Sequence, residues 1–211
     1  MQTRAILEAA IGVQRKGIRA VPEIMVPLVA TLGEVRAMRR LVEETAAAVF
    51  AEMGQSTPYR FGTMIELPRA VVCAGAIAQE VDFLSFGTND LTQMTFGFSR
   101  DDARKYLDAY IEAGILEKDP FITLDREGVG ALMRMAIESA RAVHPGIKIG
   151  VCGEHAGDPE SIEFLQSLGL DYVSCSPARI PAARLAVAQT AIAEETPDAP
   201  RVQQEALELA I

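Results

Sequence analysis

The pattern of apolar and polar positions predicts short strands that alternate with amphipathic helices along the 211 residues. Apolar runs that end at glycine or polar residues predict strands, and apolar spacings of three and four predict helices. The predicted strands cover residues 23–29, 61–65, 83–86, 147–151 and 172–174. The predicted helices cover residues 2–16, 31–53, 68–79, 128–143, 159–168 and 181–194, with a loose terminal helix over 201–211. Each strand is therefore followed by a helix, and one further helix precedes the first strand.

Local signals fix several of these boundaries. Thr31-Leu-Gly-Glu34 has the form of a capping box, and Gly54 is a plausible stop for the helix that follows. Asp158 is placed to begin the helix at Pro159. Residues 91–126 interrupt the alternation as a long excursion, with a short helix expected over 102–113. Long excursions of this kind are often lids or interface elements.

Strict strand–helix alternation with nearly continuous apolar strands predicts a parallel sheet covered by helices. A doubly wound sheet would share this pattern, but polar clusters at the carboxyl ends of three successive strands favour a (β/α)8 barrel. Five strands do not close an eight-stranded barrel. We therefore expect an α/β fold that is the C-terminal portion, about five βα units, of a (β/α)8 TIM-type barrel. The expected barrel domain is residues 1–195, followed by a C-terminal tail over 196–211.

Composition narrows the classes of partner. A net charge of −9 argues against nucleic acid or an anionic membrane, which would need a basic face. The hydrophobic content of 49% and charged content of 23% indicate a globular protein. No apolar run approaches membrane-spanning length and no signal peptide is visible, which favours a cytoplasmic location. Three cysteines, an odd number without metal-ligand spacing, indicate free thiols in a reducing compartment.

The first candidate site is the run Gly87-Thr88-Asn89-Asp90, which follows the strand at 83–86. A hydroxyl, an amide and a carboxylate at a strand's carboxyl end suit a hard cation and an oxyanion-bearing ligand. The alternative is a polar loop in which Asp90 only caps the next helix. Glu66 ends the preceding predicted strand, and carboxylates on successive strands of one sheet can reach a common ion. Glu66 and Asp90 are therefore candidate metal ligands.

The second candidate is Cys152, which ends the strand at 147–151 and precedes Gly153. With an ordinary thiol pKa of about 8.5 it should be protonated near neutral pH, which suits a proton donor to carbon. The alternative is a small buried hydrophobe, the role expected of Cys73. Cys175 ends the last strand and could line the site, but packing is the favoured role for it too. His155 could be a base or a ligand, but a role in orienting Glu154 or Cys152 fits its position better.

Three other residues are weaker candidates for a functional role. His144 stands beside Pro145 and should only terminate its helix. Arg100 and Arg179 are the arginines nearest the strand ends, and surface ion pairing is the commoner fate of such residues. An anionic ligand would then need a metal, or cations from outside this chain.

Several long segments together resemble the phosphoenolpyruvate-binding domain of the pyruvate, phosphate dikinase family over about residues 2–192. These segments are Gly62-Thr-Met-Ile-Glu-Leu-Pro-Arg69, Ser85-Phe-Gly-Thr-Asn-Asp-Leu-Thr-Gln-Met-Thr-Phe-Gly-Phe-Ser-Arg-Asp-Asp102, Cys152-Gly-Glu-His-Ala-Gly-Asp-Pro159, Pro22-Glu-Ile-Met-Val-Pro-Leu28 and Asp171-Tyr-Val-Ser-Cys-Ser-Pro177. Phosphoenolpyruvate synthase and the first enzyme of the sugar phosphotransferase system share the barrel but fit less well at Cys152-Gly-Glu-His155.

The resemblance implies a role for each candidate residue. Glu66 and Asp90 match Mg²⁺ ligands, and Cys152 matches the acid that protonates the enolate carbon. The substrate-binding set for phosphoenolpyruvate or pyruvate is Glu66, Gly87, Thr88, Asn89 and Asp90. The resemblance also implies ATP and phosphorylation chemistry in a complete enzyme, with a phosphohistidine domain, a nucleotide-binding domain and substrate-gripping arginines outside this chain.

Two other functions stay open at this point. One is a synthase or phosphotransferase-type enzyme with the same site. The other is a non-catalytic half-barrel that serves folding or dimerisation. Because five strands leave two open edges, we expect a homo-oligomer, for example a homodimer. Without the arginines expected elsewhere, the isolated chain should be inactive and bind phosphoenolpyruvate weakly.

Overall fold

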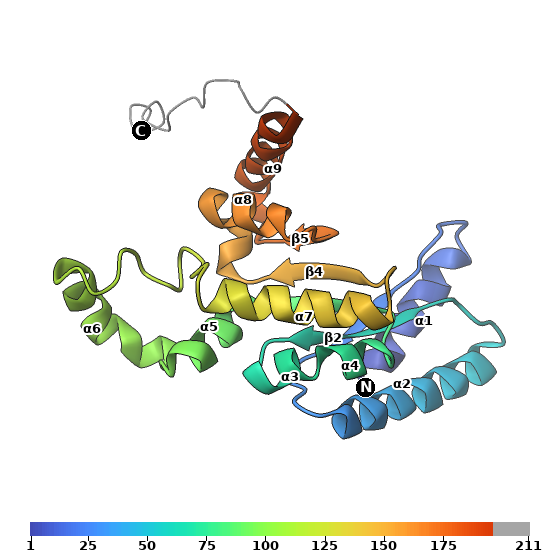
Figure 1. Cartoon of the computed structure of the whole chain (residues 1–211). Coiled ribbons are helices and arrows are strands. Elements are labelled where there is room, and N and C mark those ends of the chain that lie inside the picture. The colour runs from blue at the N-terminus through green and yellow to red at the C-terminus, as the bar shows by residue number, and fades with distance from the viewer. Residues whose placement is uncertain (196–211) are drawn as a thin grey trace.

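The protein is built on one sheet of five parallel strands (Figure 1). The structure, a computed structural model, describes residues 1–195. The strands are β1 (Glu23–Val26), β2 (Arg60–Ile65), β3 (Phe83–Gly87), β4 (Lys148–Cys152) and β5 (Tyr172–Ser174), and they lie side by side in that order. A doubly wound sheet reverses its strand order at a switch point, whereas this one runs on in a single direction as a barrel does. The predicted α/β fold of about five βα units of a barrel is confirmed.

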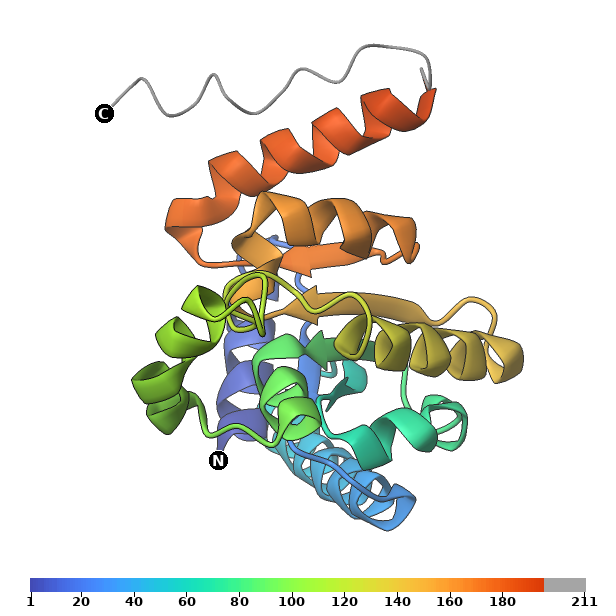
Figure 2. The ribbon, with the colours of Figure 1, turned by 60° about the vertical axis from the view of Figure 1, so that its left-hand side comes forward.

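Helices cover one side of the sheet, while α5 and α6 extend beyond the carboxyl ends of the strands (Figures 1 and 2). The helices are α1 (Gln2–Gln14), α2 (Leu32–Met53), α3 (Pro68–Val72), α4 (Ala74–Ala78), α5 (Thr88–Phe96), α6 (Arg100–Glu112), α7 (Val129–Val143), α8 (Pro159–Ser167) and α9 (Ile180–Glu195). Two 3-10 turns, η1 (Glu154–Gly157) and η2 (Pro177–Arg179), follow β4 and β5. The predicted terminal helix over 201–211 lies outside the described residues, and the division into a domain and a tail stays a prediction.

The predicted helix caps are present. The Thr31 side chain accepts a hydrogen bond from the Glu34 amide at 3.2 Å, and Glu34 accepts one from the Thr31 amide at 2.7 Å. Gly54 ends α2 in the left-handed conformation, with φ of 63°. The Asp158 side chain caps α8 by accepting from the Ser161 amide at 3.0 Å. These side-chain bonds satisfy backbone donors that a helix start leaves without partners.

Two predicted elements differ from the structure. The helix expected over 68–79 is two short helices that break at Cys73, because the Gly75 amide donates to the Ser139 hydroxyl at 3.1 Å. In a continuous helix that amide would bond to the carbonyl four residues earlier. The polar run 88–90, expected as a loop, is the first turn of α5, which extends to Phe96 and shortens the predicted excursion.

The sheet is strongly curved. Lys148 Nζ lies 2.9 Å from both carboxylate oxygens of Glu23, although β2 and β3 separate their strands. A flat sheet would hold strands β1 and β4 about three strand spacings apart, roughly 14 Å. The strand register places Met25, Met64, Ser85 and Cys152 on the concave face that this curvature creates.

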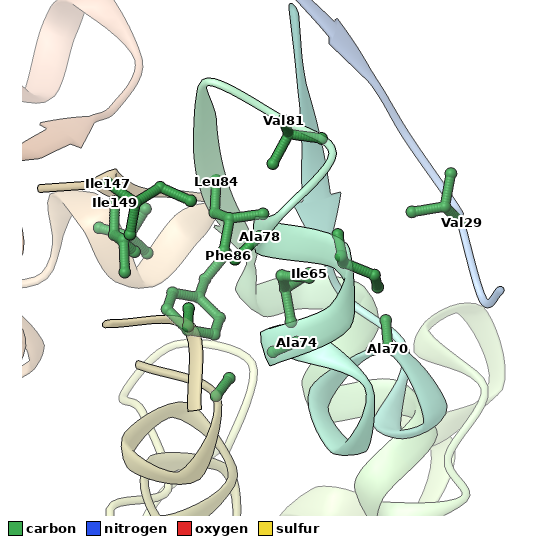
Figure 3. Close-up of a cluster of buried hydrophobic side chains, with 14 of the residues drawn as sticks. Val29, Ile65, Ala70, Ala74, Ala78, Val81, Leu84, Phe86, Ile147 and Ile149 are labelled. Atoms are coloured by element: carbon green, nitrogen blue, oxygen red, sulfur yellow. The ribbon is translucent and has the colours of Figure 1, made fainter. Parts of the chain in front are cut away.

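The convex face carries the main hydrophobic core. Ile65, Leu84 and Phe86 are at most 1% exposed and point from the strands toward Ala74 and neighbouring helix residues (Figure 3). Small alanines on α3 and α4 let these helices lie close to the sheet, and α4 in turn packs on α7. Of the helices described within residues 1–195, none combines the length and apolarity needed to cross a membrane.

We expect Gly75→Ala to destabilise the fold by about 1–3 kcal/mol, because a methyl group there has no room. A Cβ at this buried position would lie 2.6 Å from Ser139 Oγ and 3.0 Å from the Ser139 carbonyl oxygen. Gly12→Ala in α1 is the matched control, since nothing lies within 4 Å of its Cβ position. That control should stabilise the protein by up to about 1 kcal/mol through helix propensity. Urea denaturation measures both, and equal effects would contradict the packing assigned to Gly75.

Candidate active site

Glu66 is held in a buried position directly after β2. Its side chain is 3% exposed, and Oε1 accepts a hydrogen bond from the Leu28 amide at 2.6 Å. Leu28 adopts φ of 56°, a left-handed conformation that costs a non-glycine residue energy. The loop after β1 therefore bends so that its backbone reaches this carboxylate. No side-chain pattern indicates such a donor, which is why the sequence did not predict it.

Gly87 and Asp90 complete the surroundings of Glu66. A Cβ at Gly87 would lie 2.3 Å from Glu66 Oε2, so only glycine leaves space for the carboxylate. Burial raises the pKa of Glu66, and the charge of Asp90 raises it further, while the Leu28 amide opposes the rise. The two carboxylates predicted to reach a common ion are thus brought together.

The first turn of α5 faces the same edge. Gly87 is its N-cap, and no side chain of the described residues caps this helix start. The amides of Thr88, Asn89 and Asp90 therefore carry the partial positive charge of a helix N-terminus, which favours an anion. The predicted polar run keeps its position at the strand end, and as a helix start it gains donors that a plain loop lacks.

Cys152 ends β4 beside this carboxylate pair. Burial raises the pKa of its thiol, the charges of Glu66 and Asp90 raise it further, and the Ser85 hydroxyl opposes the rise. The thiol is partly exposed. These directions agree with the predicted neutral thiol. The dependence on both carboxylates also shows that Cys152 shares their electrostatic environment.

The segment after β4 lies against the start of α5 through three short polar contacts. The Thr88 hydroxyl lies 3.0 Å from the Cys152 carbonyl, and the Glu154 amide donates to Asn89 Oδ1 at 3.1 Å. His155 Nδ1 lies 2.8 Å from Thr88 Oγ1. Between these contacts Gly153 adopts φ of 114°, and a Cβ there would lie 2.6 Å from Thr88 Oγ1. The buried Thr88 side chain is thus directed into the protein.

The remaining histidines and cysteines have contacts that suit structural roles. His155 contacts Thr88 and the Pro120 carbonyl, not the Glu154 or Cys152 side chains named in the prediction. His144 ends α7, as predicted. Cys73 and Cys175 pack against the hydrophobic core, in agreement with the prediction for both.

Arg100 and Arg179, the two candidate arginines, lie beside a cavity of about 630 Å³ between α6, η1 and η2. Arg100 forms a half-exposed ion pair with Glu154 at 3.8 Å, and the aliphatic part of Arg179 packs on Gly157. The cavity is lined by Arg100, Asp101, Leu107, Asp119, Phe121, Ile122, Glu154 and Arg179. Glu66, Asp90 and Cys152 do not line this cavity, so it is separate from the carboxylate pair.

The carboxylate pair fits a hard divalent cation. Within residues 1–195 no three His, Cys, Asp or Glu side chains are grouped to hold a metal, which disfavours an all-protein metal cage. Mg²⁺ usually binds through one or two carboxylates and completes its octahedron with water and substrate oxygens. A cation would also relieve the repulsion that raises the pKa of Glu66.

We expect His155 to make stability depend on pH. Burial lowers the pKa of this imidazole, outweighing the Pro120 carbonyl and the charges of Asp158, Glu154 and Asp119, which raise it. The unfolded chain then takes up a proton near the ordinary histidine pKa of about 6.5, while the folded chain does not. Stability should fall as pH drops from that value toward the lowered pKa of the folded state.

Urea midpoints measured across this pH range test the expectation. His155→Asn should remove part of the pH-dependent loss, whereas His144→Asn should keep it. An unchanged pH slope in His155→Asn would show that the buried ring does not titrate as described.

Comparison with known proteins identifies the family of this chain. Residues 1–192 match the family of phosphoenolpyruvate-binding domains of phosphoenolpyruvate-utilising enzymes. Pyruvate, phosphate dikinase of Clostridium symbiosum is 58% identical over 193 residues, covering 91% of this chain and 22% of that protein. The chloroplastic pyruvate, phosphate dikinase of Flaveria pringlei is 55% identical over 192 residues, covering 91% and 20%. The chain therefore spans about a fifth of the length of these curated relatives.

A solved structure shares the fold. A citrate lyase from Burkholderia xenovorans superposes with a TM-score of 0.54 at 17% identity, covering 87% of this chain and 57% of that one. At this identity the likeness concerns the fold alone.

The curved parallel sheet, with carboxylates and a thiol at its carboxyl edge, defines a barrel-type ligand-binding domain. With the match over residues 1–192, the chain belongs to the family of phosphoenolpyruvate-binding domains of phosphoenolpyruvate-utilising enzymes. Its resemblance to the pyruvate, phosphate dikinases is confirmed at 55–58% identity to two of them.

Proposed function

We propose that this edge binds phosphoenolpyruvate or pyruvate with Mg²⁺, as the pyruvate-handling part of a pyruvate, phosphate dikinase. The complete enzyme would convert ATP, pyruvate and phosphate to AMP, phosphoenolpyruvate and pyrophosphate. The observation that carries the proposal is the convergence of Glu66, Asp90 and Cys152 around Gly87. This glycine pairs with Cys152 across β3 and β4, lies against the Glu66 carboxylate, and is the N-cap of the helix whose first turn holds Asp90. The names of the similar dikinases support this choice of reaction.

Glu66 and Asp90 would hold the Mg²⁺. When bound, the ion supplies a Lewis acid for the negative charge that develops on the enolate oxygen. The Leu28 amide orients Glu66 for this task, and the glycine at 87 leaves the carboxylate free of steric conflict. The start of α5 would receive the anionic part of the substrate.

Cys152 would carry the proton chemistry. In the direction of pyruvate formation, the phosphoryl group leaves for a histidine on another domain, and the thiol donates its proton to C3. The sulfur then holds the negative charge until it regains a proton. In the reverse direction the thiolate removes a methyl proton from pyruvate. A thiol whose pKa is raised suits the donor role, because it is protonated at neutral pH.

The substrate's charge suggests that further groups take part. Phosphoenolpyruvate is strongly anionic, but Arg100 and Arg179 line the cavity between α6, η1 and η2 and not the site of Glu66 and Asp90. We therefore expect the isolated chain to bind phosphoenolpyruvate weakly and to depend on arginines, a phosphohistidine and a nucleotide-binding domain of the complete enzyme. Within residues 1–195 no further strand pairs with the outer edges of β1 and β5. These open edges support a homo-oligomer, since such edges pair with other chains.

The reaction class is tested in a full-length enzyme that contains this domain. Phosphoenolpyruvate consumption should require both AMP and pyrophosphate and should form ATP, pyruvate and phosphate. Consumption that instead requires AMP and phosphate, with pyrophosphate inert and water released, would assign a synthase. Absence of either activity in a folded enzyme would contradict the catalytic proposal.

A further inference from the structure

A buried histidine outside the proposed chemistry joins three segments around the site. His155 is 0% exposed and lies three residues after Cys152, on turn η1. One ring nitrogen contacts the start of α5 at Thr88, and the other contacts the segment between α6 and α7 at Pro120, each at 2.8 Å. A fully buried imidazole with two short contacts is held in one orientation.

The partners determine where the imidazole proton lies. A carbonyl oxygen can only accept, so Nε2 must donate to the Pro120 carbonyl. In the neutral ring Nδ1 is then an acceptor and takes a hydrogen bond from the Thr88 hydroxyl. The geometry thus selects the Nε2–H tautomer.

Thr88 has one hydroxyl proton and two acceptors. Its Oγ1 lies 2.8 Å from His155 Nδ1 and 3.0 Å from the Cys152 carbonyl oxygen. While the ring is neutral, the hydroxyl can donate fully to only one of them. If the ring gains a proton, Nδ1–H donates to Thr88, and the hydroxyl is free to donate to the Cys152 carbonyl. The state of His155 therefore sets how firmly the Cys152 backbone is held to α5.

We propose that His155 is a positioning residue for Cys152 that acts through the Thr88 hydroxyl. The ring also extends this link to the wall of the neighbouring cavity, because Asp119, Phe121 and Ile122 on either side of Pro120 line it. A ligand or domain that moves this wall would change the Pro120 contact, and with it the hydrogen bond that Thr88 makes to Cys152. The charged groups that act on the ring are Asp158, Glu154 and Asp119.

The tautomer can be measured without any variant of His155. The chain has only two histidines, so long-range proton–nitrogen NMR of a histidine-labelled sample gives two ring patterns, and His144→Asn assigns them. We expect the Nε2–H neutral form for His155 at neutral pH. An Nδ1–H pattern would overturn the proposal.

The coupling to Cys152 is tested by alkylation with iodoacetamide, followed at each cysteine by peptide mass spectrometry. Thr88→Val should speed alkylation of Cys152 several-fold, because it removes the hydroxyl. His155→Leu should slow it, because the Thr88 hydroxyl can then donate fully to the Cys152 carbonyl. The double variant should behave as Thr88→Val does. Thr88→Ser, which keeps the hydroxyl, should behave as the unmodified protein. Unchanged rates at Cys73 and Cys175 show that the change is local. Multiplying effects in the double variant, or no effect in folded variants, would refute the link.

The catalytic consequence rests on the proposed function, whereas the link itself does not. In a full-length enzyme, His155→Asn should slow exchange of the pyruvate methyl protons by on the order of 10- to 100-fold with little change in KM, as expected for a displaced proton donor. The two proposals can fail separately. If Mg²⁺ and pyruvate do not bind, but the His155 tautomer and the Cys152 alkylation rates are as expected, the proposed function is wrong and the positioning role of His155 is retained. Equal losses in kcat and affinity would instead indicate general disruption.

Discussion

Replacing Glu66 with glutamine, or Asp90 with asparagine, should each reduce the pyruvate half-reaction by roughly 10²- to 10³-fold or more in a full-length enzyme. Each change removes one of the two carboxylates proposed to hold Mg²⁺, and with it the charge stabilisation of the enolate. Phosphorylation of the enzyme by ATP should continue, because the proposed phosphohistidine lies on another domain. Exchange between labelled pyruvate and phosphoenolpyruvate measures the first reaction, and labelled ATP measures the second.

Glu154→Gln is the matched control for these two variants. It removes the same charge at the same edge, but Glu154 is exposed and pairs with Arg100 at 3.8 Å. Its half-reaction should stay close to that of the unmodified enzyme. Near-normal exchange in Glu66→Gln or Asp90→Asn would show that the metal assignment is wrong.

Replacing Cys152 with alanine should stop exchange of the pyruvate methyl protons with solvent, a loss of about 10²- to 10⁴-fold for a missing acid–base group. Metal binding should survive, because Glu66 and Asp90 remain. Proton NMR of pyruvate in deuterated water measures the exchange, and Mn²⁺ titration measures metal binding.

Cys175→Ala is the control for the thiol, because Cys175 packs against the hydrophobic core. It should leave exchange unchanged. Methyl exchange that persists in Cys152→Ala would return Cys152 to the role of a small buried residue, the alternative that its sequence position left open.

The sequence predicted the elements that local chemistry controls. The Thr31–Glu34 capping box and the Asp158 cap depend on residues within one turn, so a short window suffices to find them. The meeting of Glu66 and Asp90 could also be predicted, because adjacent parallel strands end at the same edge. Both conclusions follow from local chemistry or from strand order, without knowledge of distant contacts.

Features that depend on distant partners were not predictable. The helix break at Cys73 follows from Ser139, 64 residues beyond the Gly75 amide that it binds. The donor to Glu66 is a backbone amide in a conformation that leucine rarely adopts. Asn89 and Asp90 favour both turns and helix starts, so the sequence alone did not distinguish a loop from the first turn of α5.

Paramagnetic relaxation of pyruvate by Mn²⁺ can show whether Glu66 and Asp90 hold a divalent ion beside the substrate, close to Cys152. NMR detects this even for a weak, rapidly exchanging complex of the chain itself. We expect Mn²⁺ with the unmodified chain to speed relaxation of the pyruvate methyl protons far more than Mn²⁺ with Glu66→Gln. Equal relaxation in the two samples, with Mn²⁺ bound to the unmodified chain, would contradict this expectation.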